Sequence, residues 1–428
     1  MTRRAIPFVL AAAVALAPGR AAAEGEAAGG APPAPRVRPG DGVTALVGGE
    51  VWTISGPVHR GGTILVRDGK VWRVGTDLEI PEGAKVLDCS GKRVLPGFVA
   101  TDSEGFGLAA GAPKKGSLYR DSLDPHARVL ELALGAGVLA YHHTAPQDRG
   151  FVQMQTAVLR PSEGDAFRMV LKEPSAIWVD WARGPGPERL GFEEQLRSGR
   201  RHLKETEDAR RERREAPRSP VPDAVLAALR REIPVRVPAT RRDEILDALR
   251  LADDHGLRVV LEDATEAWLV PEAIARAGAV AIVTPRRRLR DPRIAEPHGG
   301  SVEVAAILER AGARFAILPA GGAFQVGHGL RLGGIAGRDL SNYPIEGAFA
   351  IRGGASERAV LRAMTLGAAE VLGVADRVGS IEPGKDADLI VLDGDPFHYR
   401  TVVDMALVEG KVFYERARSS FYRDLPGR

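Results

Sequence analysis

The sequence predicts an α/β protein that has a parallel sheet or barrel and a smaller β-rich region. The first observation is an alternation of helical and strand patterns in the middle of the chain, over residues 243–318. The second is that residues 43–95 and 378–428, towards the two ends, contain short strand patterns separated by turns. Three successive strand–helix units favour parallel strands, whereas the pattern alone does not distinguish a closed barrel from an open sheet.

The helices and strands of the middle region follow from hydrophobic periodicity. Residues 243–255 are expected to form a helix, because Ile245 and Leu249 recur at helical spacing and Gly256 follows as a stop signal. Further helices are expected over 271–277 and 302–310. Short apolar runs at 258–261, 280–283 and 315–318 then read as buried strands between them.

Each β-rich end contains a hairpin signal. In the N-terminal region, Asp68-Gly69 lies between the strand patterns 63–66 and 71–74. In the C-terminal region a strand is expected over 387–392, and Glu409-Gly410 joins the strand patterns 405–408 and 411–414. Asp-Gly between β-rich runs is a strong indication of a tight hairpin turn.

The first 23 residues have the features of a signal peptide. Arg3 and Arg4 form a positive start, residues 5–17 are apolar but too short for a typical membrane span, and Ala21–Ala23 offers a cleavage site. We therefore expect an exported protein, periplasmic or extracellular, with no transmembrane anchor after cleavage. Residues 24–42, rich in Ala, Gly and Pro, are expected to form a flexible tether.

The charge balance argues against a nucleic-acid-binding protein, and the cysteine content argues against a protein stabilised by internal disulfides. The formal net charge is +3 for all 428 residues, and cleavage after Ala23 removes three arginines and no acid, so the mature chain is neutral. This balance does not favour nucleic-acid binding. The single cysteine, Cys89, cannot form an internal disulfide and is expected to be structural.

Residues 197–217 carry both signs of charge, as in an exposed helix; the alternative is a basic docking surface.

Two motifs make the chain resemble the metal-dependent amidohydrolases related to imidazolonepropionase, dihydroorotase and isoaspartyl dipeptidase. Residues 92–104, KRVLPGFVATDSE, resemble the family's barrel opening, and residues 378–392, VGSIEPGKDADLIVL, resemble its returning β-domain. The resemblance implies a TIM-like (β/α)8 barrel over 96–377 and a composite β-sandwich from 43–95 and 378–428. It also implies a hydrolase acting on non-peptide C–N bonds, which uses a metal ion to generate hydroxide.

The family's metal-ligand positions carry other residues in this sequence. The first His-x-His pair corresponds to Asp102 and Glu104. The later positions correspond to Pro238, Thr240, Asp263 and Ala320, the last from the least certain part of the comparison. We therefore expect no zinc site and no cofactor. An alternative is that Asp102, Glu104 and Asp263 converge and hold a hard divalent cation, such as calcium or magnesium.

The candidate site residues are those that the resemblance places at the barrel mouth. Asp263 and Glu104 are the candidate general bases. Asp102, Glu104, His142, His143 and Asp263 are the candidate pocket residues. Since adjacent residues of a strand point to opposite faces, at most one of His142 and His143 faces the mouth. The alternative for this pair is a loop or capping role.

Two functions follow from these residues. The first is a non-catalytic homologue whose barrel mouth binds a small molecule or another protein, with a homo-oligomer as a further expectation. The second is an active hydrolase with a rearranged, carboxylate-based site. Substrate and ligand are not specified by the sequence.

Overall fold

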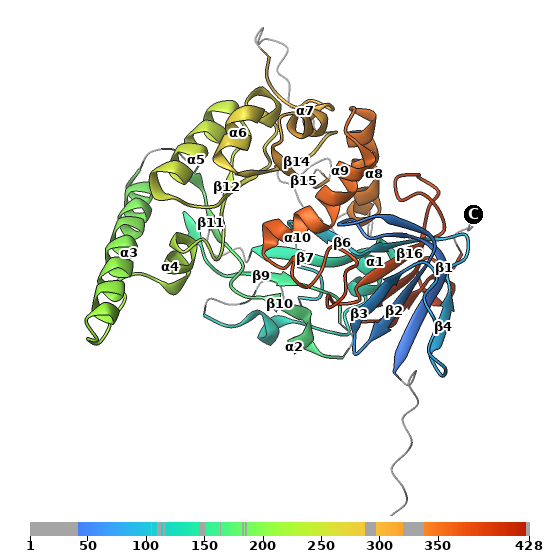
Figure 1. Ribbon diagram of the computed structural model, residues 1–428. Helices are drawn as coiled ribbons and strands as arrows, with labels where there is room; N and C mark the ends of the chain where they lie inside the picture. The colour runs from blue at the N-terminus through green and yellow to red at the C-terminus, as the bar shows by residue number, and fades with distance from the viewer. Residues whose placement is uncertain are drawn as a thin grey trace, which may run out of the picture. The chain divides into compact units, whose positions relative to one another are not determined.

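A computed structural model describes residues 42–424, apart from 104, 109–112, 114–115, 145–149, 163, 182–183, 185, 287–296 and 320–337 (Figure 1). The chain divides into two compact units, residues 1–38 and 39–428, and every described element belongs to the second. The predicted signal peptide and most of the predicted tether lie outside the described residues. No helix among the described residues is both long enough and apolar enough to span a membrane.

Strands from both ends of the chain form one eight-stranded sheet. Its order is β18-β17-β16-β5-β1-β2-β3, with β4 pairing with β1. The strands are β1 (Val43–Trp52), β2 (Val58–Arg67), β3 (Lys70–Gly75), β4 (Lys85–Asp88), β5 (Arg93–Pro96), β16 (Leu389–Leu392), β17 (Val403–Val408) and β18 (Lys411–Glu415). The ends meet where β16 runs antiparallel to β5, with Ile390 opposite Leu95. The two chain ends thus meet as predicted for the composite β-sandwich, with all of these strands in one sheet (Figure 1).

Both predicted hairpins are confirmed. Strands β2 and β3 pair antiparallel across Asp68-Gly69, and β17 and β18 pair across Glu409-Gly410. All four turn residues have positive φ: 53° for Asp68, 77° for Gly69, 47° for Glu409 and 71° for Gly410. Two positive φ values in succession characterise the tight turn whose twist matches that of the flanking strands. Cys89, which directly follows β4, is buried in the core of this sheet, and burial raises the pKa of its thiol to about 11, as expected for a structural residue.

The middle of the chain forms the barrel wall from two sheets, and the predicted fold class is confirmed. One sheet has the order β10-β9-β7-β6 and the other β15-β14-β13-β12-β11-β8. The strands are β6 (Phe98–Ala100), β7 (Val138–Thr144), β8 (Val152–Gln153), β9 (Thr156–Leu159), β10 (Val170–Lys172), β11 (Ile177–Val179), β12 (Val235–Pro238), β13 (Val259–Glu262), β14 (Val280–Val283) and β15 (Arg314–Ile317). Strands β11 to β15 pair in parallel, as do β6 and β7.

One part of the wall runs in the reverse direction. Strand β9 is antiparallel to β7, and β8, which precedes it directly, is antiparallel to β11. Residues 152–159 therefore connect the two sheets as a single reversed segment, interrupted at Met154–Gln155. No periodicity in this short stretch predicts its direction.

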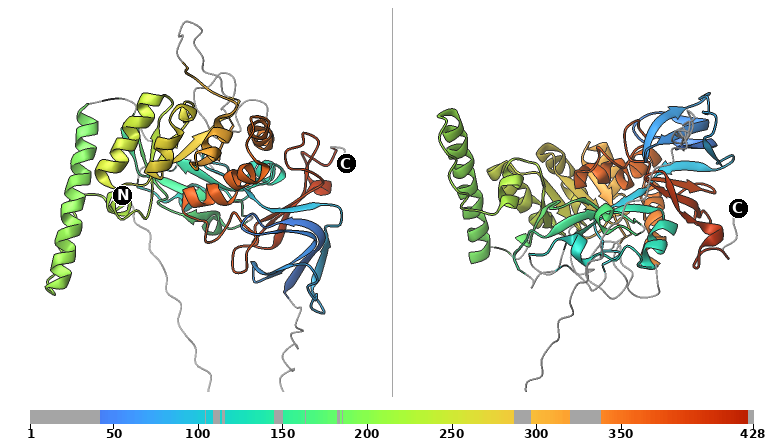
Figure 2. Two further views of the ribbon diagram at one scale, coloured as in Figure 1. Left: turned by 45° about the horizontal axis from the view of Figure 1, so that its top comes forward. Right: turned by 90° about the horizontal axis from the view of Figure 1, so that it is seen from below.

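Helices cover the outside of the strands (Figures 1 and 2). The longer helices are α1 (Val129–Gly135), α3 (Pro187–Arg211), α4 (Asp223–Leu229), α5 (Arg242–His255), α6 (Pro271–Ala277), α7 (Val304–Arg310), α8 (Arg338–Arg352), α9 (Glu357–Met364) and α10 (Leu366–Leu372). The predictions for α5, α6 and α7 are confirmed to within two residues. Helix α5 ends at Gly256, whose φ of 62° permits the left-handed cap.

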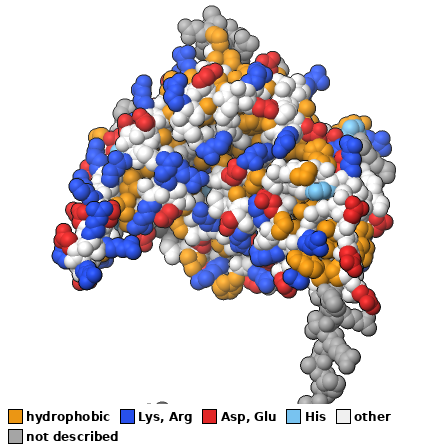
Figure 3. Space-filling model, in the orientation of Figure 1, with side chains coloured by type: hydrophobic (Ala, Val, Ile, Leu, Met, Phe, Trp, Pro, Cys, Tyr) orange, Lys and Arg blue, Asp and Glu red, His pale blue; other side chains and the backbone are white. Residues whose placement is uncertain are grey.

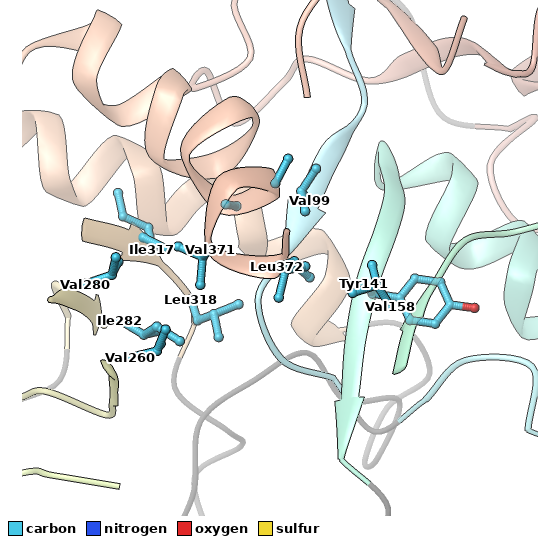
Figure 4. Packing of buried hydrophobic residues seen from close by; sticks show 14 of the residues in the cluster. Val99, Tyr141, Val158, Val260, Val280, Ile282, Ile317, Leu318, Val371 and Leu372 are labelled. Carbon is cyan, nitrogen blue, oxygen red and sulfur yellow. The ribbon is translucent and has the colours of Figure 1, made fainter. Parts of the chain in front are cut away.

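Helix α10 fills the space between β15 and β6. In Figure 4, Val371 and Leu372 lie between Leu318, just after β15, and Val99 of β6. The Tyr343 hydroxyl on α8 also donates a hydrogen bond of 2.9 Å to the carbonyl oxygen of Val99. Apolar side chains thus continue the core across this side of the wall.

The charged helix α3 begins earlier than predicted, and it ends at Arg211 rather than continuing to residue 217. Acids and bases alternate on its surface, as Figure 3 shows. Its ion pairs include Arg201 with Glu194 at 3.0 Å and Arg211 with Glu207 at 2.5 Å, all with exposed side chains. These pairs fit the predicted solvent-exposed helix.

A buried cluster of charges joins the β9 end of the barrel wall to the composite sheet. Arg160, which is only 2% exposed, contacts Asp386 at 3.1 Å, Asp388 at 3.6 Å and Glu409 at 2.5 Å. Asp386 also accepts hydrogen bonds from Lys70 at 2.8 Å and from Arg377 at 2.7 Å. The two aspartates of the C-terminal motif therefore hold the two parts of the fold together.

Candidate functional site

The predicted site residues that the structure describes lie at the carboxyl ends of barrel strands. Asp102 follows β6, Pro238 ends β12, Thr240 follows it, and Asp263 follows β13. Because β12 and β13 are parallel neighbours, their carboxyl ends share one edge of the wall. Glu104 and Ala320 lie outside the described residues.

A buried ion pair lies next to these positions. The Arg236 Nε of β12 is 2.5 Å from the Glu262 Oε1 of β13, and both residues are almost completely buried. The Trp178 indole N–H of β11 donates to Glu262 Oε2 at 2.9 Å. Arg236 Nη2 donates to the carbonyl oxygen of Thr101 at 2.8 Å. Three strands and the end of β6 are thereby connected by polar contacts inside the barrel.

Strand register brings these side chains together. Trp178 is opposite Arg236 in the β11–β12 pairing, so both point to the same face of the wall. Pro238 is opposite Glu262 in the β12–β13 pairing, which makes Arg236 and Glu262 diagonal neighbours. Val235 and Val237 point to the other face and are buried there. A buried charge needs such a partner, because an unpaired one would cost several kcal/mol, on the order of 3–5.

His142 and His143 lie within β7 and not in a loop, so the alternative of a loop or capping role is wrong. Their surroundings differ, as expected for neighbours on a strand. Neither ring nitrogen of the fully buried His142 has a hydrogen-bond partner among the described residues, and its Nδ1 is 3.9 Å from Asp102 Oδ1. On the other face, His143 Nδ1 is 3.0 Å from the Tyr119 hydroxyl.

Burial holds both imidazoles in the neutral form. For His142, burial lowers the pKa well below its ordinary value, and the positive charge of Arg236 lowers it further. For His143, burial lowers the pKa to about 4, although Asp102 opposes the shift. Both imidazoles are therefore neutral near pH 7.

These depressed histidine pKa values predict a loss of stability in acid. The folded state keeps its full stability above the ordinary histidine pKa of about 6.5 and loses stability as the pH falls towards 4. In this range the histidine is protonated in the unfolded chain but stays neutral in the folded chain, so acid favours unfolding. For His143 the loss is roughly 3 kcal/mol. Urea unfolding at several pH values should show a shallower fall for His143→Gln. The exposed His126→Gln variant should retain the wild-type slope, and an unchanged slope in His143→Gln would contradict the assignment.

Asp263 has an uncommon backbone conformation directly after β13. Its φ is 53°, in the left-handed region that aspartate tolerates better than most residues. The Thr240 hydroxyl donates to Asp263 Oδ2 at 3.3 Å, and the Thr265 hydroxyl donates to Oδ1 at 3.3 Å. The carboxylate is thus held in place at the edge of the wall.

Two of the family's ligand positions carry residues that do not fit the metal ion that the resemblance implies. Pro238 has no donor atom in its side chain, and Thr240 is hydrogen-bonded to Asp263. Glu262, the buried acid beside them, is paired with Arg236. In the part of the chain that the structure describes, no three His, Cys, Asp or Glu side chains are grouped so that they could hold a metal ion. With Glu104 outside that part, a site made of Asp102, Glu104 and Asp263 stays a prediction.

Four residues of this polar cluster were not predicted from the sequence: Thr101, Trp178, Arg236 and Glu262. A signal was present: Arg236 interrupts a run of strand-forming valines, and Glu262 ends the Val-Val-Leu run of the next strand. A charge within a strand that is buried on both faces needs a partner nearby. The sequence does not show, however, which distant residue supplies that partner.

Comparisons with known proteins agree with this fold. A model of the amidohydrolase family matches residues 244–414. An amidohydrolase from Thermotoga maritima MSB8 is 26% identical, with a TM-score of 0.68 over 87% of this chain and 100% of that one. Molinate hydrolase and A. niger ochratoxinase are each 17% identical, with TM-scores of 0.51 over 90% of this chain and 98% of theirs, and show the fold alone. No curated protein matches the chain.

The barrel, the composite sheet and the family match together define an amidohydrolase-type barrel protein. Residues 244–414 match the amidohydrolase family, and the fold is similar to that of an amidohydrolase over most of the chain. Because one barrel supports many chemistries, the superfamily does not by itself define this chain's activity.

Proposed function

We propose that this protein is a metal-independent member of the superfamily that binds a small molecule at its barrel mouth without hydrolysing it. The buried Arg236–Glu262 ion pair is the observation that carries the proposal. Arg236 carries a positive charge two residues before Pro238, which stands at one of the family's ligand positions. Arg236 also contacts Thr101, which directly precedes Asp102 at another of these positions.

This charge opposes a second cation. Arginine stays protonated in proteins, so Arg236 repels a divalent ion, and it also engages Glu262, the buried carboxylate that could attract one. In family enzymes the metal generates hydroxide from water and polarises the substrate. At two of the corresponding positions, Pro238 and Thr240 have side chains unsuited to that role.

We also propose that the mature protein is exported, on the basis of residues 1–23. The short apolar segment, its preceding arginines and the Ala21–Ala23 sequence support cleavage after Ala23. The mass of the chain recovered from the periplasm or medium tests this directly. A full-length chain retained inside the cell would contradict it.

Metal analysis tests the metal-independent assignment. After incubation with zinc, manganese or calcium and removal of free ion, the purified mature protein is expected to contain less than stoichiometric metal. Its Tm is expected to be unchanged by each ion, because an ion that bound the folded state would stabilise it. Stoichiometric metal that is lost in Asp102→Asn would place the ion at the barrel mouth and overturn the proposal.

The second candidate function is an active hydrolase that uses Asp263 as a general base. The observation that favours it is the positive φ of Asp263, since unusual backbone conformations concentrate at functional sites. A panel of amides, dipeptides and lactams, with and without divalent ions, tests this function. Turnover abolished by Asp263→Asn but retained by Asp253→Asn, an exposed aspartate of α5, would establish it. Absence of turnover across the panel is the expected result.

A further inference from the structure

A second concave site lies away from the Arg236 cluster, at the break between the two barrel sheets. It is a cleft of about 880 Å³ between the 3-10 helix η1 (Tyr119–Ser122), the short helix α2 (Ala166–Met169), strand β10 and the β8–β9 junction. Its apolar walls are formed by Leu118, Val152, Met154, Phe167 and Val170. None of the residues proposed for the barrel mouth lines it.

The reversed wall segment explains why the cleft is open. Strand β8 pairs with β11, whereas β9 pairs with β7, so the sheets separate at Met154–Gln155. Phe167 is 70% exposed and Leu118 is 42% exposed. Two large exposed apolar residues in one concavity indicate a binding surface more strongly than scattered ones do.

Charges of both signs line the same cleft. The Glu173 carboxylate is half-buried and accepts the Tyr119 backbone N–H, with a nitrogen–oxygen distance of 3.2 Å. The Arg120 guanidinium lies 5.1 Å above the centre of the Phe167 ring, and its Nε is 3.9 Å from Asp121. Burial raises the pKa of Glu173, and the Tyr119 N–H and the positive charge of Arg120 oppose that rise. The Glu173 and Arg120 side chains both line the cleft.

We propose that this cleft binds a zwitterionic small molecule, an α-amino acid with an apolar side chain. Its ammonium group would pair with Glu173, its carboxylate with Arg120, and its side chain would cover Phe167 and Met154. Opposite charges on an apolar wall are complementary to this class of ligand, because charge-assisted hydrogen bonds fix both ends while the apolar part is buried. The proposal is independent of the function proposed for the barrel mouth.

Isothermal titration calorimetry with three probes of matched shape tests the ligand class. The probes are L-phenylalanine, 2-phenylethylamine, which lacks the carboxylate, and 3-phenylpropanoate, which lacks the ammonium group. L-phenylalanine is expected to bind the mature protein about tenfold or more tightly than either of the other two probes, since each of those lacks one charge-assisted contact. Equal affinity for all three probes, or no binding of L-phenylalanine, would overturn the proposal.

Two variants assign the charges. Glu173→Gln is expected to abolish the preference for L-phenylalanine over 3-phenylpropanoate, and Arg120→Gln is expected to abolish its preference over 2-phenylethylamine. Glu357→Gln is the matched control, because Glu357 is another partly buried glutamate whose pKa burial raises, and it does not line the cleft. Circular dichroism checks that each variant is folded. A folded Glu173→Gln protein with wild-type probe preferences would contradict the assigned contacts.

Discussion

Replacing Glu262 with alanine is expected to lower the free energy of unfolding by about 3–5 kcal/mol. The substitution leaves the Arg236 guanidinium, which is fully buried, without its carboxylate partner. It also removes the acceptor of the Trp178 indole N–H. An uncompensated buried charge is more costly than the loss of a typical hydrogen bond, so this single change should destabilise the barrel strongly. Urea unfolding followed by far-ultraviolet circular dichroism measures the effect.

A matched surface pair provides the control for this prediction. Glu207→Ala removes the partner of Arg211 on helix α3, where both side chains are exposed, and should cost no more than about 1 kcal/mol. The double variant Arg236→Met/Glu262→Leu should recover much of the stability lost by Glu262→Ala, because it removes both buried charges. A cost below about 1 kcal/mol for Glu262→Ala would show that the pair does not hold the barrel together.

The elements that local patterns determine were predictable from the sequence. Helix α5 combines apolar residues at helical spacing with Gly256 at its end, and both features are encoded within fifteen residues. The hairpins at Asp68-Gly69 and Glu409-Gly410 likewise follow from turn residues and flanking strand formers. The composite sheet and the barrel required the family resemblance, because pairing between β5 and β16 joins residues almost 300 positions apart.

The polar interior could not be predicted in the same way. Arg236 contacts the Thr101 carbonyl oxygen across 135 positions, and Arg160 contacts Asp386 across 226. Hydrophobic periodicity identifies a buried face, but it does not identify which distant polar group satisfies a charge there. The cleft at Met154–Gln155 was missed for a related reason, since it arises from a reversal of strand direction that no local pattern records.

The two buried ion clusters have different consequences for function. The Arg236–Glu262 pair lies inside the barrel next to the predicted site positions, so it bears on the proposed function. The Arg160 cluster lies where β9 meets the composite sheet and contains two aspartates of the motif by which the family resemblance was found. A family motif can therefore be explained by its role in holding the fold, without a catalytic role for its acids.

Replacing Arg160 with methionine is expected to lower the free energy of unfolding by about 3–5 kcal/mol at neutral pH. Methionine fills much of the same space, but Asp386, Asp388 and Glu409 lose their shared positive partner. Asp386 retains Lys70 and Arg377, whereas among the described residues the Asp388 carboxylate retains only the backbone N–H of Glu409. Asp388 should therefore account for most of the loss, which urea unfolding measures.

The loss should depend on pH in a defined direction. Burial already raises the pKa of Asp388 to about 6, and Arg160 opposes that rise, so removing Arg160 raises it further. For a carboxyl whose folded pKa is raised, stability is retained at low pH and is lost as the pH rises through the folded value. The difference between wild type and Arg160→Met should thus be smaller at pH 5 than at pH 8. Arg168→Met, which removes a more exposed partner of Glu409, should cost about 1 kcal/mol or less at both pH values. A penalty for Arg160→Met that does not change with pH would mean that Asp388 does not sense the guanidinium.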